Sequence, residues 1–357
     1  MTQASDSPNG QAIRGQLTLS EIISQPALWS DTYARMQRQS WPRLTEEPGV
    51  ISGAGSSAYA AAAIQAAWPH AKAIPTTELI LDISRLNGAD FLLSLARSGD
   101  SPESIAVVEM AAQEYPDVTQ FAITCNPEGK LARSAGIKVA QLNPRTNDQS
   151  LAMTSSFSNL VLAGLSLSFS TVLDQHLGTI CERVRERLLA LTSLAAEVAK
   201  QCPNRAVVLA SPPLFPWAQE ASLKIMEMTS GRVAAMAETY LGLRHGPMSF
   251  INPETLVLCL VSVDSRRRLY ERDLISELRA KRLGRIIGIA PVSSAADEFE
   301  LCVEAMAGEL PDHLRTPFEI IFPQLLAYEL SLRSGLDPDS PSPEGIITRV
   351  VPGIHIH

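Results

Sequence analysis

The sequence has no block of basic residues and no long uninterrupted hydrophobic run. Its net charge is −8, which argues against nucleic acid or an anionic membrane surface as a partner. The longest apolar run, 160–173, is interrupted by serines and is too short to cross a bilayer. Residues 1–10 are polar and lack the hydrophobic core of a signal sequence. We therefore expect a cytoplasmic protein that contacts neither membrane nor nucleic acid.

Cysteine and histidine are scarce and scattered along the chain. The five cysteines are odd in number and form no C-x-x-C pair, so we expect reduced thiols rather than disulfides or a zinc site. Among the six histidines, His355 and His357 form an H-x-H pair, but no cysteine or carboxylate stands beside them. A metal pair there is the less favoured alternative, and we expect no metal and no cofactor. The cysteines are Cys125, Cys181, Cys202, Cys259 and Cys302.

Apolar residues make up 45% of the 357 residues and charged residues 19%, a composition that suits two globular domains. Strand and helix patterns alternate from Val50 onward and restart at Arg205, after a long helical stretch at 150–200. Such alternation predicts two similar α/β halves, each a parallel sheet covered by helices on both faces. We expect strands at 50–53, 78–83, 91–95, 119–124 and 137–141, and again at 205–210, 233–236, 255–262, 286–290 and 300–304. The expected domains are an N-terminal segment with one helix (1–45), a first half (46–200), a second half (201–335) and a tail (336–357).

Two serine- and glycine-rich turns, 52–57 and 97–104, each connect a predicted strand to a helix. Hydroxyls and free backbone N–H groups converge there at the positive end of the helix dipole, which favours a phosphate group. The turn 97–104 has no lysine, so a P-loop nucleotide site is excluded. Two alternatives remain open: a Rossmann dinucleotide turn at 53–58 with Asp82 on the ribose, or two helix N-caps without a ligand.

The second half contains charged residues in a pattern that suits proton transfer. Lys224 and Glu227 are three residues apart on a predicted helix, so they share one face. Apolar neighbours would partly desolvate Glu227, which favours a general base, whereas the alternative is an ordinary surface ion pair. His245 lies in an Arg-His-Gly-Pro turn from which it can reach a cleft, or else it is an exposed loop histidine.

Together, the serine-rich turns, the Lys-x-x-Glu helix and the Arg-His-Gly-Pro turn resemble the sugar isomerase (SIS) domain, as in the isomerase half of glucosamine-6-phosphate synthase. The chain is more similar to the AgaS group of tagatose-6-phosphate ketose/aldose isomerases and galactosamine-6-phosphate deaminases. The segments that carry this resemblance are 97–104, 147–157, 243–247 and 349–353. It implies an α/β fold of two tandem SIS domains, each a mainly parallel sheet flanked by helices in a flavodoxin-like or Rossmann-like three-layer sandwich.

The resemblance also implies a role for each matching residue. Glu227 matches the base that moves a proton between C1 and C2, Lys224 an active-site lysine near the sugar hydroxyls, and His245 the histidine that opens the ring in a neighbouring subunit's site. Arg97 departs from the synthase, which has glutamine there, and would add a charged phosphate contact. The implied phosphate-binding residues are Ser56, Ser57, Arg97, Ser98 and Ser101, and the implied sugar-binding residues are Gly55, Thr154 and Ser155.

These roles imply a homo-oligomeric enzyme with a shared active site that converts galactosamine 6-phosphate to tagatose 6-phosphate and ammonia. The chain has no glutamine-amidotransferase half, which favours deamination over synthesis. Plain isomerisation of tagatose 6-phosphate and a non-catalytic phosphosugar sensor are the alternatives, although no helix-turn-helix accompanies the second. The apolar runs 160–163 and 188–191 would supply either an oligomer surface or a connection packed between the halves.

Overall fold

The computed structural model describes residues 14–291, 296–349 and 355–357. Its strands form two five-stranded sheets, and every pair of neighbouring strands is parallel. The first sheet contains β1 (Gly49–Ser52), β2 (Ala71–Ala73), β3 (Phe91–Ala96), β4 (Thr119–Thr124) and β5 (Lys138–Gln141). The second contains β6 (Arg205–Ala210), β7 (Ala234–Glu238), β8 (Leu256–Leu260), β9 (Arg285–Ala290) and β10 (Leu301–Glu304).

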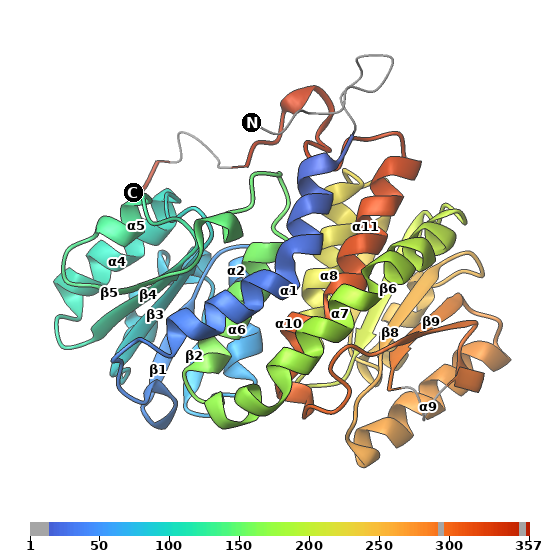
Figure 1. Cartoon of the computed structure of the whole chain (residues 1–357), viewed down its shortest axis with the longest axis horizontal. Coiled ribbons are helices and arrows are strands. Elements are labelled where there is room, and N and C mark those ends of the chain that lie inside the picture. The colour runs from blue at the N-terminus through green and yellow to red at the C-terminus, as the bar shows by residue number, and fades with distance from the viewer. Residues whose placement is uncertain (1–13, 292–295, 350–354) are drawn as a thin grey trace.

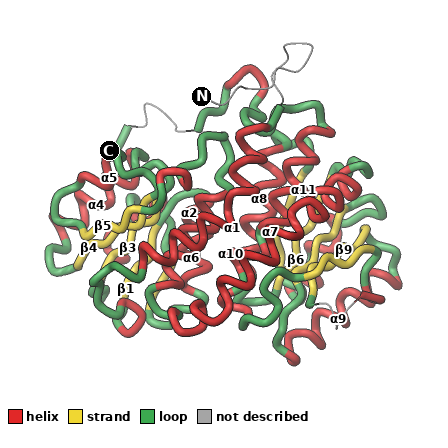
Figure 2. Tube along the Cα trace, viewed as in Figure 1, coloured by secondary structure: helices red, strands yellow, loops and turns green. Residues whose placement is uncertain are grey.

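Helices cover both sheets and fill the space between them. They are α1 (Gln16–Met36), α2 (Ser56–Gln65), α3 (Thr76–Leu79), α4 (Pro102–Glu114), α5 (Lys130–Arg133), α6 (Ser155–Ser166), α7 (Ser170–Ala199), α8 (Phe215–Met228), α9 (Ser265–Ala280), α10 (Thr316–Glu319) and α11 (Ile321–Arg333). Figure 1 shows α1, α2, α6, α8 and α11 between the sheets, and Figure 2 shows the strands as two separate groups on either side of them.

The two sheets have the same strand order. The first runs β2-β1-β3-β4-β5, and the second, read from its other edge, runs β7-β6-β8-β9-β10. This is the doubly wound order in which the chain changes direction between the first and third strands, and ligands bind at the carboxyl ends of those strands. The prediction of two similar, parallel α/β halves is confirmed, with switch points between β1 and β3 and between β6 and β8.

The two halves share one hydrophobic core, because the central helices contact both sheets. All residues of α6 are buried, and α2 packs against both α6 and α8. The main core cluster joins Ile51 and Leu93 of the first sheet to Val208 and Leu258 of the second. Strands β3 and β8 are buried along their whole length, as parallel strands with both faces covered require. The serine-rich turns at the ends of β1 and β3 therefore follow strands that are fixed in this core.

The strand expected at 78–83 is wrong. Leu79, Ile83 and Leu86 are buried at helical spacing within α3 and the following 3₁₀ turn. The second strand of the sheet is instead β2, an edge strand of three residues, which is too short to leave a period-two pattern in the sequence.

The helical stretch 150–200 forms α6 and α7, and most of its apolar side chains pack inside the chain. Leu160 and Leu162 are fully buried in the central core, so the run 160–163 offers no surface to a partner. In the second run, Leu191 is buried but Leu189 is 81% exposed. The structure therefore supports the interpretation that 160–163 belongs to a connection packed between the halves.

The tail returns across the molecule to the first half. Asp337 accepts a hydrogen bond from the backbone N–H of Gly15 (2.8 Å), and Asp339 accepts one from that of Thr18 (2.7 Å), which caps the start of α1. The carbonyl oxygen of Asp339 also accepts from the N–H of Leu151 (3.0 Å). The tail residues that follow reach the first half, where the described chain ends close to α5 (Figure 1).

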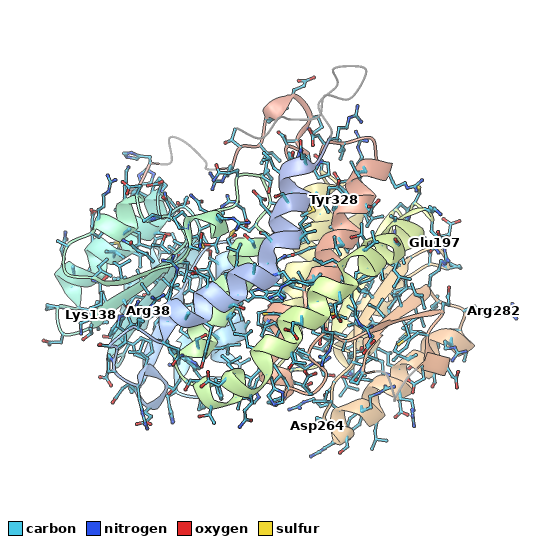
Figure 3. All side chains as sticks on the ribbon, in the orientation of Figure 1. Arg38, Lys138, Glu197, Asp264, Arg282 and Tyr328 are labelled. Atoms are coloured by element: carbon cyan, nitrogen blue, oxygen red, sulfur yellow. The ribbon has the colours of Figure 1, made fainter. Side chains whose placement is uncertain are left out.

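Figure 3 shows Tyr328 of α11 among the central helices, whereas Lys138 of β5 and Arg282 lie at opposite outer edges of the molecule. Within the described residues, no helix combines the length and the apolar character needed to span a bilayer.

Candidate active site

A cavity of about 360 Å³ opens at the switch point of the first sheet, beyond the ends of β1 and β3. Its walls come from the two serine-rich turns, the loop before α6, the end of α8 and the C-terminal tail. The structure thus brings together segments from both halves of the chain. The predicted site residues that line this cavity are Gly55, Ser56, Ser57, Arg97, Ser98, Ser101 and Glu227.

The turn after β3 presents polar groups toward the start of α4. Gly99 has φ 69°, a left-handed conformation in which a side chain would be strained and would contact Leu131 at 3.3 Å. The side chain of Asn126 donates to the carbonyl oxygen of Ser98 (2.9 Å) and holds the turn in place. In the part of the chain that the structure describes, no protein acceptor takes the backbone N–H of Ser98 or Gly99. These N–H groups are therefore available to an anion.

Lys224 and Glu227 form an ion pair at the end of α8, and Lys224 is completely buried. Glu227 retains 31% exposure of its side chain and faces the cavity, so the pair is not an ordinary surface ion pair. The Lys224 ammonium also donates to the hydroxyl of Ser56 (3.0 Å). Burial alone would lower the pKa of Lys224, but the carboxylates of Glu220 and Glu227 outweigh it and raise that pKa, so the ammonium stays charged.

Glu220 is a buried carboxyl that the sequence analysis missed. It lies one helical turn before Lys224 on α8 and is 0% exposed, with an oxygen 3.4 Å from the Lys224 ammonium. Burial raises the pKa of Glu220 to about 7, although the charge of Lys224 opposes this. The signal in the sequence was its spacing of four residues from Lys224, which places both on one helix face.

Arg97 and Arg349 place two guanidinium groups at the cavity wall. Arg97 donates to the backbone carbonyl oxygens of Leu151 (3.1 Å) and Arg349 (3.1 Å), so it fastens the tail to the loop before α6. Arg349 in turn donates to the side chain of Asn147. Arg349 belongs to the motif 349–353, from which no role was predicted for it. Residues 350–353 of that motif lie outside the described residues.

Thr154 and Ser155, the predicted sugar contacts, do not line the cavity. Both are fully buried. Asp148 accepts from the backbone N–H groups of Thr154 (2.8 Å) and Ser156 (2.8 Å) and from the hydroxyl of Ser155, which caps the start of α6. In this structure the two residues are buried at the start of α6, next to the loop that lines the cavity.

His245 lies in a 3₁₀ turn, Gly242–His245, that follows β7. Its side chain is exposed and does not line the cavity of its own chain. Neighbouring Arg244 is held by Glu277, whose carboxylate accepts from it at 2.8 Å. Among the described residues, no group of three or more His, Cys, Asp or Glu side chains could hold a metal ion.

The switch point of the second sheet is built differently. The backbone N–H of Ser262 donates to Glu271 (3.0 Å), and that of Val263 donates to Asp312 (3.0 Å). Both carboxyl groups are buried. These N–H groups follow β8 as those of Ser98 and Gly99 follow β3, but here the chain's own carboxylates accept from them.

No family model matches the sequence. The D-galactosamine-6-phosphate deaminase AgaS of Shewanella sp. (strain ANA-3) is 34% identical over 378 residues, which cover 96% of this chain and 95% of that protein. This chain belongs to the AgaS family. The resemblance proposed from the motifs is confirmed by a match that extends over nearly the whole sequence.

Solved structures agree with the AgaS assignment. Tagatose-6-phosphate ketose/aldose isomerase from Escherichia coli has a TM-score of 0.84 and 30% identity, and the match covers 96% of each chain. The C-terminal domain of glucosamine-fructose-6-phosphate aminotransferase from Francisella tularensis has a TM-score of 0.73 at 19% identity, covering 92% of this chain and 98% of that one. The second likeness concerns the fold alone, and it agrees with two tandem SIS domains.

A carboxyl of α1 supports the cavity loop of this AgaS chain. Glu21 accepts from the backbone N–H groups of Gln149 (2.5 Å) and Ser150 (3.1 Å), next to the cavity residue Leu151. Burial, and then the charge of Asp148, raise the pKa of Glu21 from 4.5 to about 7. The loop before α6, which Arg97 contacts on the cavity side, is thus also hydrogen-bonded to the carboxyl group of Glu21, whose pKa is near neutral.

We expect this group to make stability depend on pH. The folded state holds a proton on Glu21 that the unfolded state releases between pH 4.5 and about 7, so stability falls as the pH rises through that window. In Glu21→Gln this titration is absent. The unfolding free energy of the variant minus that of wild type therefore rises by roughly 1–3 kcal/mol from pH 4.5 to about pH 7. Urea unfolding of both proteins at several pH values measures the difference; a constant difference contradicts the prediction.

Proposed function

We propose that this chain is a D-galactosamine-6-phosphate deaminase that isomerises its substrate and releases tagatose 6-phosphate and ammonia. The observation that carries the proposal is one cavity that joins a serine-rich anion site to the partly exposed Glu227, whose carboxylate is paired with the buried Lys224 behind the cavity wall. The names of the AgaS relative and of the similar E. coli isomerase supply the substrate class.

The phosphate of the substrate binds at the starts of α2 and α4. The hydroxyls of Ser57, Ser98 and Ser101 and the free N–H groups of the turn donate to its oxygens, and the helix dipoles favour its charge. The hydroxyl of Ser101 donates to Glu103 in this structure and turns from that carboxylate to the phosphate when the substrate binds. The guanidinium groups of Arg97 and Arg349 add positive charge at the same wall. The phosphate thereby fixes the far end of the sugar and orients C1 and C2 toward α8.

Glu227 acts as the base on the opened sugar. It removes the proton from C2, which carries the amino group, and the electron pair moves to form an enolamine between C1 and C2. Return of the proton to C1 leaves an imine at C2. Water adds to this carbon and ammonia leaves, which gives the 2-ketose 6-phosphate. The Lys224 ammonium orients the Glu227 carboxylate and stabilises negative charge that develops on the substrate.

The test is release of ammonia from galactosamine 6-phosphate by the purified protein, with ketose formation measured in the same sample. Turnover of tagatose 6-phosphate without ammonia release from the amino sugar supports the plain isomerase instead. A rise in melting temperature with sugar phosphates but no turnover of either supports a sensor. Either of the last two results overturns the proposal.

The assembly that we propose is a homo-oligomer in which His245 opens the sugar ring in a neighbouring subunit's site. This is supported by the exposure of His245 and by its absence from the cavity of its own chain. We also propose a cytoplasmic location, which the unpaired state of all five cysteines supports.

A mixing experiment tests the shared site. Glu227→Gln and His245→Ala proteins are each expected to be inactive. After unfolding and refolding together, they regain part of the wild-type ammonia release, because some hybrid sites combine an intact Glu227 with an intact His245. Each variant refolded alone is the control. A mixture that stays inactive although both variants remain folded and oligomeric contradicts the shared site.

A further inference from the structure

Ser56 differs from the other serines of the cavity in what its hydroxyl contacts. It is the first residue of α2 and is only 4% exposed. Its oxygen accepts a hydrogen bond from the ammonium of Lys224 at 3.0 Å. This contact joins the anion-binding turn of the first half to the helix of the second half that carries the base.

The Lys224 ammonium has three N–H donors, and among the described residues two groups accept from it: Glu227, one turn later on α8, and Ser56. Glu220, one turn before the lysine, forms an ion pair with the ammonium at 3.4 Å, but its oxygens have no hydrogen-bond partner. Among the described residues, Ser56 is the acceptor that comes from outside this helix. A flexible side chain placed between two carboxylates of its own helix is thus fixed by a hydroxyl from α2.

We infer that Ser56 is a positioning residue for Lys224 rather than a ligand of the phosphate. This inference rests on the proposed function, which leaves the phosphate to Ser57, Ser98, Ser101 and the turn. With Ser56 in place, the ammonium is held where it can orient the Glu227 carboxylate toward C2. Because Ser57 is the next residue, a phosphate bound at the start of α2 also fixes the position of Lys224.

Alanine substitutions of the two adjacent serines distinguish these roles. In Ser56→Ala, kcat for galactosamine 6-phosphate falls about 10–100-fold while KM changes little, because the reacting groups are misplaced but the phosphate contacts remain. In Ser57→Ala, KM rises about tenfold or more, since a hydrogen bond to a charged group is lost. Ser56→Thr keeps a hydroxyl at this position and recovers most of kcat. The limbs of the pH profile of kcat shift in Ser56→Ala and not in Ser57→Ala.

Calorimetric binding of inorganic phosphate distinguishes a positioning role of Ser56 from a phosphate-binding role without the need for turnover. Ser56→Ala is expected to bind phosphate as wild type does, and Ser57→Ala to bind it more weakly. If wild type releases no ammonia, the proposed function fails, and the phosphate measurement still decides the role of Ser56. A rise in KM and a loss of phosphate affinity in Ser56→Ala equal to those of Ser57→Ala overturn the inference. Thermal unfolding confirms that each variant is folded.

Discussion

Substitution of Glu227 by glutamine lowers kcat for galactosamine 6-phosphate about 10²–10⁴-fold, the range expected when a general base is removed. The amide keeps the size of the side chain and can still accept from Lys224, but it cannot take the proton from C2. Because the phosphate is held by groups at α2 and α4, KM is expected to stay near the wild-type value. Ammonia release under saturating substrate measures the loss.

The matched control is Glu109→Gln, the same chemical change on the exposed face of α4. Its kcat and KM are expected to equal those of wild type.

Exchange of the C2 hydrogen with deuterated solvent provides a second measurement, since it requires only the first proton transfer and is lost in Glu227→Gln. Full activity or unchanged exchange in Glu227→Gln means that another group is the base.

Substitution of Lys224 by methionine is expected to abolish turnover and to lower the unfolding free energy by about 3–5 kcal/mol, because it leaves a buried carboxyl without its charged partner. Glu220 is fully buried and Glu227 partly so, and both contact the ammonium. Methionine fills a similar volume, so the loss reports on charge rather than on a cavity. Urea unfolding measures the stability.

A double variant separates the two effects of Lys224. Adding Glu220→Gln to Lys224→Met removes the stranded buried carboxyl and is expected to restore much of the lost stability but none of the activity. A single variant Lys224→Met that unfolds within about 1 kcal/mol of wild type contradicts the buried ion pair described above.

The sequence predicted the sheets well where strands are buried and apolar along their whole length. Strands such as β3 and β8 form continuous apolar runs, and their pattern follows from covering both faces of a parallel sheet. The edge strand β2 has three residues and one buried side chain, so its position depends on pairing with β1 rather than on its own composition. Local pattern could not reveal it.

The candidate site was predicted where a motif at the end of a strand or on a helix face carried the signal. The two serine-rich turns meet at one cavity because the carboxyl ends of β1 and β3 are neighbours, and Glu227 joins them because α8 packs against α2. What could not be predicted depends on contacts between distant segments. Arg349 reaches the site through a tail fastened by Arg97, and Thr154 is buried behind the cavity, where its backbone N–H donates to Asp148.

The carboxylates at the second switch point bear on how many substrate molecules one chain holds. Glu271 and Asp312 already accept from the N–H groups of Ser262 and Val263, so these N–H groups are not free to bind a second phosphate. The two halves thus differ at their switch points. The first has free N–H groups that can bind a ligand, whereas in the second carboxyl groups of the chain itself occupy the equivalent N–H groups. A binding titration with a sugar phosphate should therefore reach an equivalence point of one per chain, not two.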